Sequence, residues 1–274
     1  MDQPCLVVTL NTLGVLAPAH RSIRDTVDVV TFCLNAIEQG DLSDWAPTDR
    51  MRFTLRFPEE ISAEQRKAAY THWLLSKGFQ ELARALRQML EEAFFYNGMV
   101  ARAGQIHTWA ELQAEQQELR EAASKMQFPD LLEEVNKRLT TPLHYERELS
   151  SVQQARNCLE HRDGIIQERD VDPVTRVLHL RLPGMRLFYE EEGQQIDVGP
   201  GTQVEKDTEI MSQVVVVERE FKLGERVTFR ADEFHDIGFG CWVIADDLVH
   251  RLPQLPPKAG EARSADAETK APQS

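Results

Sequence analysis

The spacing of apolar side chains predicts a series of helices in the first 164 residues. In most of these segments the apolar residues recur three or four positions apart, which places them on one face of a helix. One further segment is rich in Glu and Gln and favours a polar helix. We expect helices over 22–38, 62–96, 108–126, 128–139 and 142–164. Since short links join several of these segments, the sequence predicts a helical bundle.

Local signals mark several helix ends. Ser62 is a favourable N-cap, and Gln65 stands three residues later, as in a capping box. Gly40 and Gly164 are residues of the kind that follow the last turn of a helix. Gly78 interrupts the longest helical segment, so it indicates either a kink or a close helix crossing.

One stretch between the first two expected helices alternates apolar and polar residues. Met51, Phe53, Leu55 and Phe57 are each separated by a single residue, and Pro58 follows them. Alternation of this kind is typical of a strand with one buried face. The sequence therefore predicts a short strand or an extended loop here.

The pattern changes after residue 164 from helical spacing to short extended runs. These runs cover 177–182, 185–189, 213–219 and 226–230. Pro183-Gly184 is a turn signal between the first two runs, and residues 223–225 are typical of a hairpin tip. A final helix is expected over 232–249. We interpret this region as a small β-rich appendage packed on the bundle.

Together these patterns predict an α+β fold that is mainly an α-helical bundle, with a small C-terminal β-rich appendage. Residues 1–60 are expected to form a helical or irregular segment that packs on the bundle. Residues 61–164 would form the helical domain, and residues 165–250 the appendage. Residues 251–274 are rich in Pro, Ala and Ser, which is typical of a disordered tail.

Composition restricts the classes of function. The chain has 274 residues and a formal net charge of −14. Broad nonspecific binding along a nucleic-acid backbone requires a basic surface, so this charge argues against it. A small local phosphate site is compatible with the charge. Any chemistry on RNA should then depend on a few placed residues or on a partner surface.

The cysteines and the hydropathy favour a cytoplasmic protein without a membrane segment. Cys5, Cys33, Cys158 and Cys241 are scattered, with no spacing typical of a zinc site or a disulfide framework. The first residues lack the features of a signal peptide, and nowhere are there enough consecutive apolar residues for a membrane-spanning helix. The histidines show no metal-ligand spacing. We expect no metal and no cofactor.

Residues 153–164 contain the pattern with most chemical content. Arg156 is followed by Asn157, and His161 stands five positions after the arginine. This pattern resembles the R-polar-x3-H signature of the HEPN superfamily, in the variant with Asn at the polar position. The resemblance covers roughly residues 60–164, where the last helix of a bundle carries the pattern.

The resemblance implies a metal-independent endoribonuclease with Arg156, Asn157 and His161 as catalytic residues. It implies a homodimer as well, because nucleases of this superfamily form their cleft between paired domains. The RNA products would carry a 2′,3′-cyclic phosphate and a 5′-hydroxyl. Since such proteins often belong to toxin or anti-phage systems, an antitoxin or a defence-complex protein is an expected partner.

The residue types suit this chemistry, whereas their spacing presents a geometric difficulty. An imidazole can exchange protons near neutral pH, and a guanidinium can hold phosphate oxygens. Asn157 would orient the histidine or the phosphate. Asn157 and His161 lie on one helix face, but Arg156 is about 140° around the axis from His161 at 100° per residue. Either the long arginine side chain turns back, or a second copy of the helix completes the site.

Two other interpretations remain open. Arg156 and His161 could instead form an ion-pair cluster at a helix end with Glu148, Glu160 and Asp163. The protein would then be a catalytically inactive HEPN-like scaffold or sensor that mediates protein interaction. A third class, less well supported by the sequence, is a regulatory protein that binds a small molecule.

Overall fold

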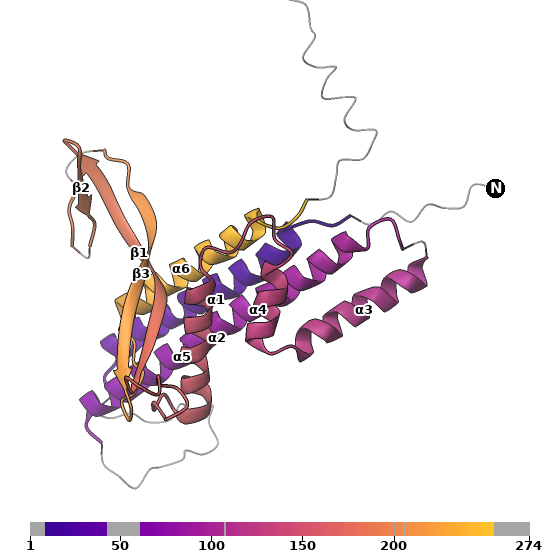
Figure 1. Cartoon of the computed structure of the whole chain (residues 1–274). Coiled ribbons are helices and arrows are strands. Elements are labelled where there is room, and N and C mark those ends of the chain that lie inside the picture. Colours follow the sequence, from indigo (N-terminus) through magenta and orange to yellow (C-terminus); the bar gives the residue numbers. More distant parts are fainter. Residues whose placement is uncertain (1–8, 43–60, 107, 200, 205–206, 255–274) are drawn as a thin grey trace, which may run out of the picture.

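The computed structural model describes residues 9–42, 61–106, 108–199, 201–204 and 207–254. These residues form a mainly helical α+β fold with six helices and a small antiparallel sheet, as the sequence predicts (Figure 1). The expected strand around Met51–Phe57 and most of the expected tail lie outside the described residues.

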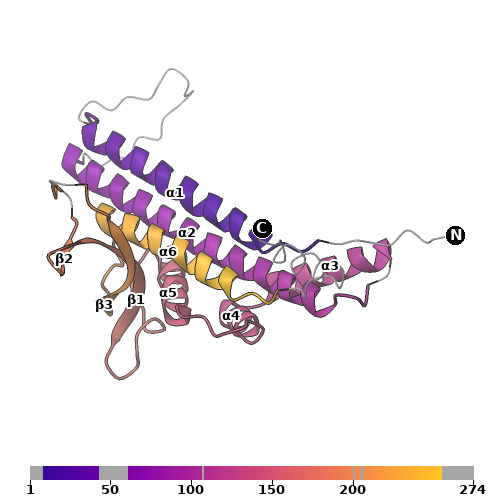
Figure 2. The same cartoon turned by 90° about the horizontal axis from the view of Figure 1, so that it is seen from above.

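Helices α1 (Leu13–Gln39) and α2 (Ala63–Ala101) lie side by side (Figures 1 and 2). The capping box of α2 is confirmed: the Gln65 N–H donates to Ser62 Oγ at 3.2 Å, and the Ser62 N–H donates to Gln65 Oε1 at 3.0 Å. The expected start of the first helix at Ser22 was wrong, since α1 begins at Leu13. Val15 and Ala19 are buried, so the apolar face continues through the first turns.

Three shorter helices follow α2. They are α3 (Trp109–Lys125), α4 (Phe128–Asn136) and α5 (Glu146–Arg162). Helix α5 ends as expected just before Gly164, whose φ of 77° requires a conformation that glycine adopts easily. Helices α4 and α5 pack on α2, with Leu131, Leu149 and Val152 fully buried. This packing fixes which face of α5 is left at the surface.

The sheet has the order β2-β1-β3, and all its pairs are antiparallel. Its strands are β1 (Val177–Glu191), β2 (Gln194–Asp197) and β3 (Met211–Lys222). The end of the sheet that carries β2 projects beyond the helices (Figure 1). The first half of β1, which lies at the bottom of the sheet in Figure 1, packs against α5 and α6.

The expected turn at Pro183-Gly184 was wrong, because β1 continues through both residues. The Arg181 N–H donates to Ser151 Oγ of α5 at 3.0 Å, so it points away from β3. Pro183, two residues later, has its nitrogen on that same edge of the strand. Pairing with β3 therefore loses no hydrogen bond at the proline, and the ladder is uninterrupted from Val177 to Phe188.

The expected strand over 226–230 was also wrong. The turn expected at 223–225 is present, but it does not connect two paired strands. The described residues of this segment form only one isolated bridge, between Ile165 and Arg226. The turn after β3 is hydrogen-bonded to the segment that follows α5: the Ile166 N–H donates to the Glu225 carbonyl at 2.9 Å. Phe229 stacks on Phe79 with 4.4 Å between ring centroids. Val227 and Phe229 are buried, so burial of its apolar side chains, and not strand pairing, holds this segment against the core.

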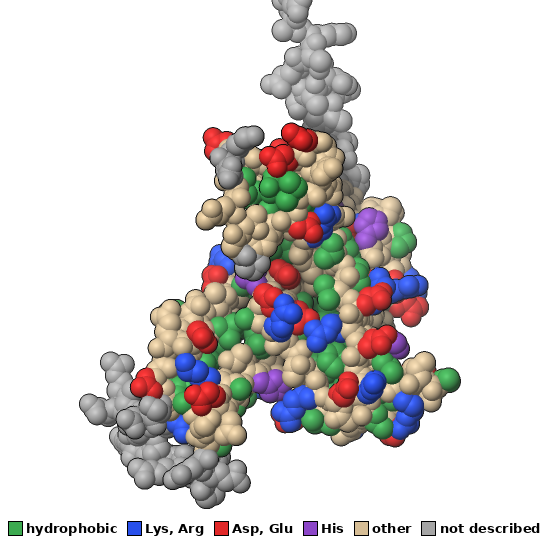
Figure 3. All heavy atoms as spheres, turned by 90° about the vertical axis from the view of Figure 1, so that its left-hand side faces the viewer, with side chains coloured by type: hydrophobic (Ala, Val, Ile, Leu, Met, Phe, Trp, Pro, Cys, Tyr) green, Lys and Arg blue, Asp and Glu red, His purple; other side chains and the backbone are tan. Residues whose placement is uncertain are grey.

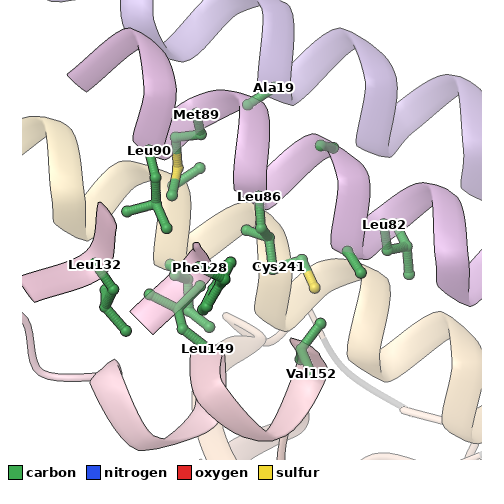
Figure 4. Close-up of a cluster of buried hydrophobic side chains, with 14 of the residues drawn as sticks. Ala19, Leu82, Leu86, Met89, Leu90, Phe128, Leu132, Leu149, Val152 and Cys241 are labelled. Carbon is green, nitrogen blue, oxygen red and sulfur yellow. The ribbon is translucent and has the colours of Figure 1, made fainter. Parts of the chain in front are cut away.

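Helix α6 (Ala231–His250) packs against α1, α2 and β1. Gly78 marks a close helix crossing, since a methyl group at that position would lie 2.7 Å from Phe234 of α6 and from Val30 of α1. Figure 4 shows buried side chains from α1, α2, α4, α5 and α6 in one cluster. The helix expected within the appendage thus completes the core of the bundle. Among the helices of the described residues, none combines the length and the hydropathy of a membrane-spanning segment.

Candidate functional site

The face of α5 that points away from the core carries the candidate residues. Leu149, Val152, Ala155 and Cys158 are buried against the other helices. The remaining face carries polar side chains at helical spacing, namely those of Ser150, Gln153, Gln154, Asn157 and His161. From Ser150 to His161 this polar face extends about 16 Å along the helix axis, at 1.5 Å per residue.

This face forms one wall of a surface cavity of about 590 Å³. Arg87 contributes from α2, and Phe128 contributes from the beginning of α4. The segment after α5 contributes Arg169 and Asp170, and Leu178 contributes from the beginning of β1. The cavity is thus assembled from five parts of the chain, of which α2 is the most distant in sequence from α5.

All three residues of the motif line this cavity from a single chain. Arg156 Nη1 donates to Asn157 Oδ1 at 3.2 Å, so the guanidinium turns toward the face that carries Asn157 and His161. The same oxygen accepts a second hydrogen bond, from Gln153 Nε2 at 3.0 Å. The separation of about 140° around the helix therefore does not keep the arginine out of the cavity.

The cavity lining is cationic although the protein is acidic. It includes four arginines and one histidine, at positions 87, 156, 161, 162 and 169. Asp170 is the one carboxylate of the lining, and it accepts hydrogen bonds from Arg162 Nη2 at 2.6 Å and from the Gln167 N–H at 2.9 Å. Arg169 Nη2 donates to Gln167 Oε1 at 3.2 Å. Three of these arginines are paired with carboxylates, Arg87 with Glu91, Arg156 with Glu160 and Arg162 with Asp170, so the excess of positive charge is small. Guanidinium groups nevertheless bind phosphate oxygens well.

Basic side chains are not gathered broadly on the face that carries the sheet. In Figure 3 the blue and red side chains on this face are interspersed, and red ones are prominent on the projecting end of the sheet. Glu191 and Glu192 are exposed at that end. This distribution agrees with a localised anion site and offers no continuous basic track on this face.

The expected ion-pair cluster at the end of α5 forms only in part. Arg156 pairs with Glu160, and His161 Nε2 lies 3.9 Å from Glu160 Oε2. Asp163 pairs with Arg226 and Glu148 pairs with Arg181, each at 3.1 Å, so these two acids do not join the motif. The Arg156 and His161 side chains keep 31% and 60% of their surface exposed, which leaves both accessible to a ligand.

Other chemistry at this site finds less support in the structure. Cys158 is buried behind the motif, and burial, followed by the charge of Asp170, raises the pKa of its thiol. Such a thiol is a poor nucleophile. Within the described ranges, no group of three or more His, Cys, Asp or Glu side chains is arranged to hold a metal ion.

The sequence pattern assigned no role to three residues that the fold brings to the motif. Arg87 is distant in sequence, so only tertiary structure places it there. Arg169 lies between Glu168 and Asp170, so the sequence gives no sign that this arginine faces a cationic cavity. Gln153 is four residues before Asn157, and this helical spacing was the one available signal.

No protein-family model, no curated protein and no solved structure matches this chain. The interpretation of the site therefore depends on the motif residues and on the cavity that they line.

Proposed function

We propose that this protein is a metal-independent endoribonuclease that cleaves RNA at the cavity lined by Arg156, Asn157 and His161. The observation that carries the proposal is the meeting of a guanidinium, an amide and an exposed imidazole in one cationic cavity. A phosphodiester carries the charge that such a cavity attracts, and the cavity borders a helix face about 16 Å long.

The chemistry uses a nucleophile that RNA itself provides. His161 removes the proton of the 2′-hydroxyl, and the 2′-oxygen attacks the adjacent phosphorus. The bond from phosphorus to the 5′-oxygen breaks, and that oxygen receives a proton. The products are a 2′,3′-cyclic phosphate and a 5′-hydroxyl. Arg156 and Asn157 stabilise the negative charge that develops on the phosphate oxygens.

A homodimer is part of this proposal because two proton transfers are required. One imidazole accepts the proton of the 2′-hydroxyl, so a second acid must protonate the leaving oxygen in the same step. The equivalent histidine of a second copy across a two-fold axis would be such an acid. Light scattering coupled to size-exclusion chromatography tests this arrangement, and a monomer that cleaves RNA at full rate would contradict it.

We further propose that the protein acts in the cytoplasm, within a toxin–antitoxin or anti-phage defence system. Cys33, Cys158 and Cys241 are free thiols, which suits a reducing compartment. The net charge of −14 disfavours indiscriminate binding of cellular RNA, so an antitoxin or a defence-complex protein would direct or restrain the cleavage.

The decisive experiment compares RNA cleavage in EDTA by the wild type, Arg156→Ala and His161→Ala. We expect the wild type to cleave RNA but not the same sequence in 2′-deoxy form, and both variants to lose activity. Arg84→Ala and His179→Ala are matched controls, since both side chains are exposed and lie outside the cavity lining. Cleavage that survives in His161→Ala would exclude this site.

A catalytically inactive scaffold or sensor is the second candidate, and the Arg156–Glu160 ion pair favours it. In that case the pair would stabilise the end of α5, and the cavity would bind a nucleotide or phosphate without turnover. Purified wild type would then bind RNA or a nucleotide yet leave RNA intact in every buffer. If the protein captures a partner protein, and changes at the projecting end of the sheet abolish this capture, the result would support this candidate further.

A further inference from the structure

Two neighbouring side chains donate hydrogen bonds to the same oxygen of the Asn157 side-chain amide. Its Oδ1 accepts from Gln153 Nε2 at 3.0 Å and from Arg156 Nη1 at 3.2 Å. An amide oxygen has two lone pairs, so these two bonds use its accepting capacity. Within the described part of the chain, the Nδ2 group of Asn157 has no hydrogen-bond partner.

These two bonds determine which end of the amide faces a ligand. If the Asn157 amide were reversed, its NH2 group would meet the N–H of Arg156, which cannot act as an acceptor, and would also meet the NH2 group of Gln153 unless that amide reversed as well. The orientation with Nδ2 free is therefore strongly favoured. Since Asn157 lines the cavity, it offers a ligand two N–H donors and no free acceptor.

We propose that Gln153 is a positioning residue that holds the Asn157 amide so that Nδ2 donates to a nonbridging phosphate oxygen. This inference depends on the proposed function and adds a residue to it. It also restricts the ligand class, because the Arg156 guanidinium and the Asn157 NH2 group can be satisfied only by an acceptor such as an oxyanion.

Gln153 has a role that Arg156 cannot fill during catalysis. Arg156 is shared between Asn157 and the Glu160 carboxylate, and it would turn to the phosphate when RNA binds. Asn157 Oδ1 then loses one of its two donors. Gln153 remains as the donor that keeps the amide in place, since its own side chain is half-buried along α5.

The first test separates this role from a structural one by kinetics. Gln153→Leu keeps the approximate size and removes the donor, so we expect kcat to fall about tenfold, the worth of one hydrogen bond, with little change in KM. Gln153→Glu should lower kcat further, because its carboxylate attracts the NH2 group of Asn157 and turns Oδ1 toward the phosphate. Gln113→Leu is the control, since this exposed glutamine lies on α3 outside the cavity.

The second test asks whether Gln153 acts through Asn157. If it does, Gln153→Leu introduced into Asn157→Ala should cause no further loss of kcat. Independent, additive losses would overturn the proposal. An unchanged kcat in Gln153→Leu would overturn it as well, and an equal loss in Gln113→Leu would assign the effect to general destabilisation.

A third measurement does not require cleavage, so it distinguishes failure of this inference from failure of the proposed function. The side-chain NH2 signals of Asn157 in NMR spectra, identified by their loss in Asn157→Ala, are followed during titration with inorganic phosphate and with a 2′-deoxy oligonucleotide. We expect saturable shifts in the wild type and markedly smaller ones in Gln153→Leu. Equal shifts in both proteins would refute the positioning role, even if the wild type did not cleave RNA.

Discussion

Replacing Glu160 by Gln should strengthen phosphate binding at the cavity. Glu160 pairs with Arg156, so the free protein already holds a carboxylate where the proposed site needs a phosphate oxygen. A ligand must displace this carboxylate or share the guanidinium with it. Glutamine keeps the shape of the side chain and removes its charge, so the competition is reduced without opening a gap.

The exposure of the pair limits the size of the effect. The Arg156 and Glu160 side chains keep 31% and 36% of their surface exposed, so solvent screens the attraction between them. Exposed pairs of this kind contribute about 0.2–1 kcal/mol. Release of that attraction corresponds to an increase in affinity of up to about fivefold, since 1.4 kcal/mol is tenfold.

The assay is the dissociation constant of a 2′-deoxy oligonucleotide, which binds without being cleaved, measured at two salt concentrations. The gain in Glu160→Gln should shrink at the higher salt, because counterions screen the removed charge. Glu191→Gln is the control for net charge, since Glu191 is exposed at the projecting end of the sheet. Weaker binding in Glu160→Gln, or an equal gain in Glu191→Gln, would refute the proposed competition.

Three further predictions concern the stability and reactivity of the fold. Gly78→Ala should destabilise the protein by about 1–3 kcal/mol in denaturant unfolding, because the added methyl group would lie 2.7 Å from Phe234; an unchanged midpoint would contradict the tight crossing. Arg181→Ala should lower the free energy of unfolding by about 1–3 kcal/mol, because the Glu148 carboxylate, whose side chain is only 5% exposed, then lacks its cation. A loss of stability no larger than that expected for an exposed ion pair would contradict this. Burial raises the pKa of Cys241 to about 12, so below that pH its thiol stays protonated in the folded protein; alkylation at pH 8 should need denaturant, and rapid labelling of the native protein would refute this.

The helical part of the fold was largely predictable because its signals are local. The Ser62–Gln65 capping box and the glycine after α5 depend on neighbours within one turn, so the sequence alone contains them. The errors in the sheet have a different origin. Alternation reveals which side chains are buried, as for Phe229, but not whether the backbone pairs. The proline in β1 is tolerated because its nitrogen lies on the strand edge that does not pair with β3, and no local pattern contains this pairing.

The position of the motif residues on one helix was predictable from the sequence, whereas the cavity that they line was not. The spacing of Asn157 and His161 places them on one helix face, and both line the cavity. The position of the Arg156 guanidinium depends on side-chain torsions and on its bond to Asn157, neither of which a helical wheel represents. Arg87 reaches the same cavity from α2, which required the tertiary fold.

The packing of α6 against α1 and α2 also bears on the synthesis of the protein. Helix α1 is synthesised before α6, yet Val30 of α1 and Phe234 of α6 both lie against Gly78, so this part of the core cannot close until α6 has been made. A nascent chain that has not reached residue 250 therefore exposes apolar surface and attracts chaperones.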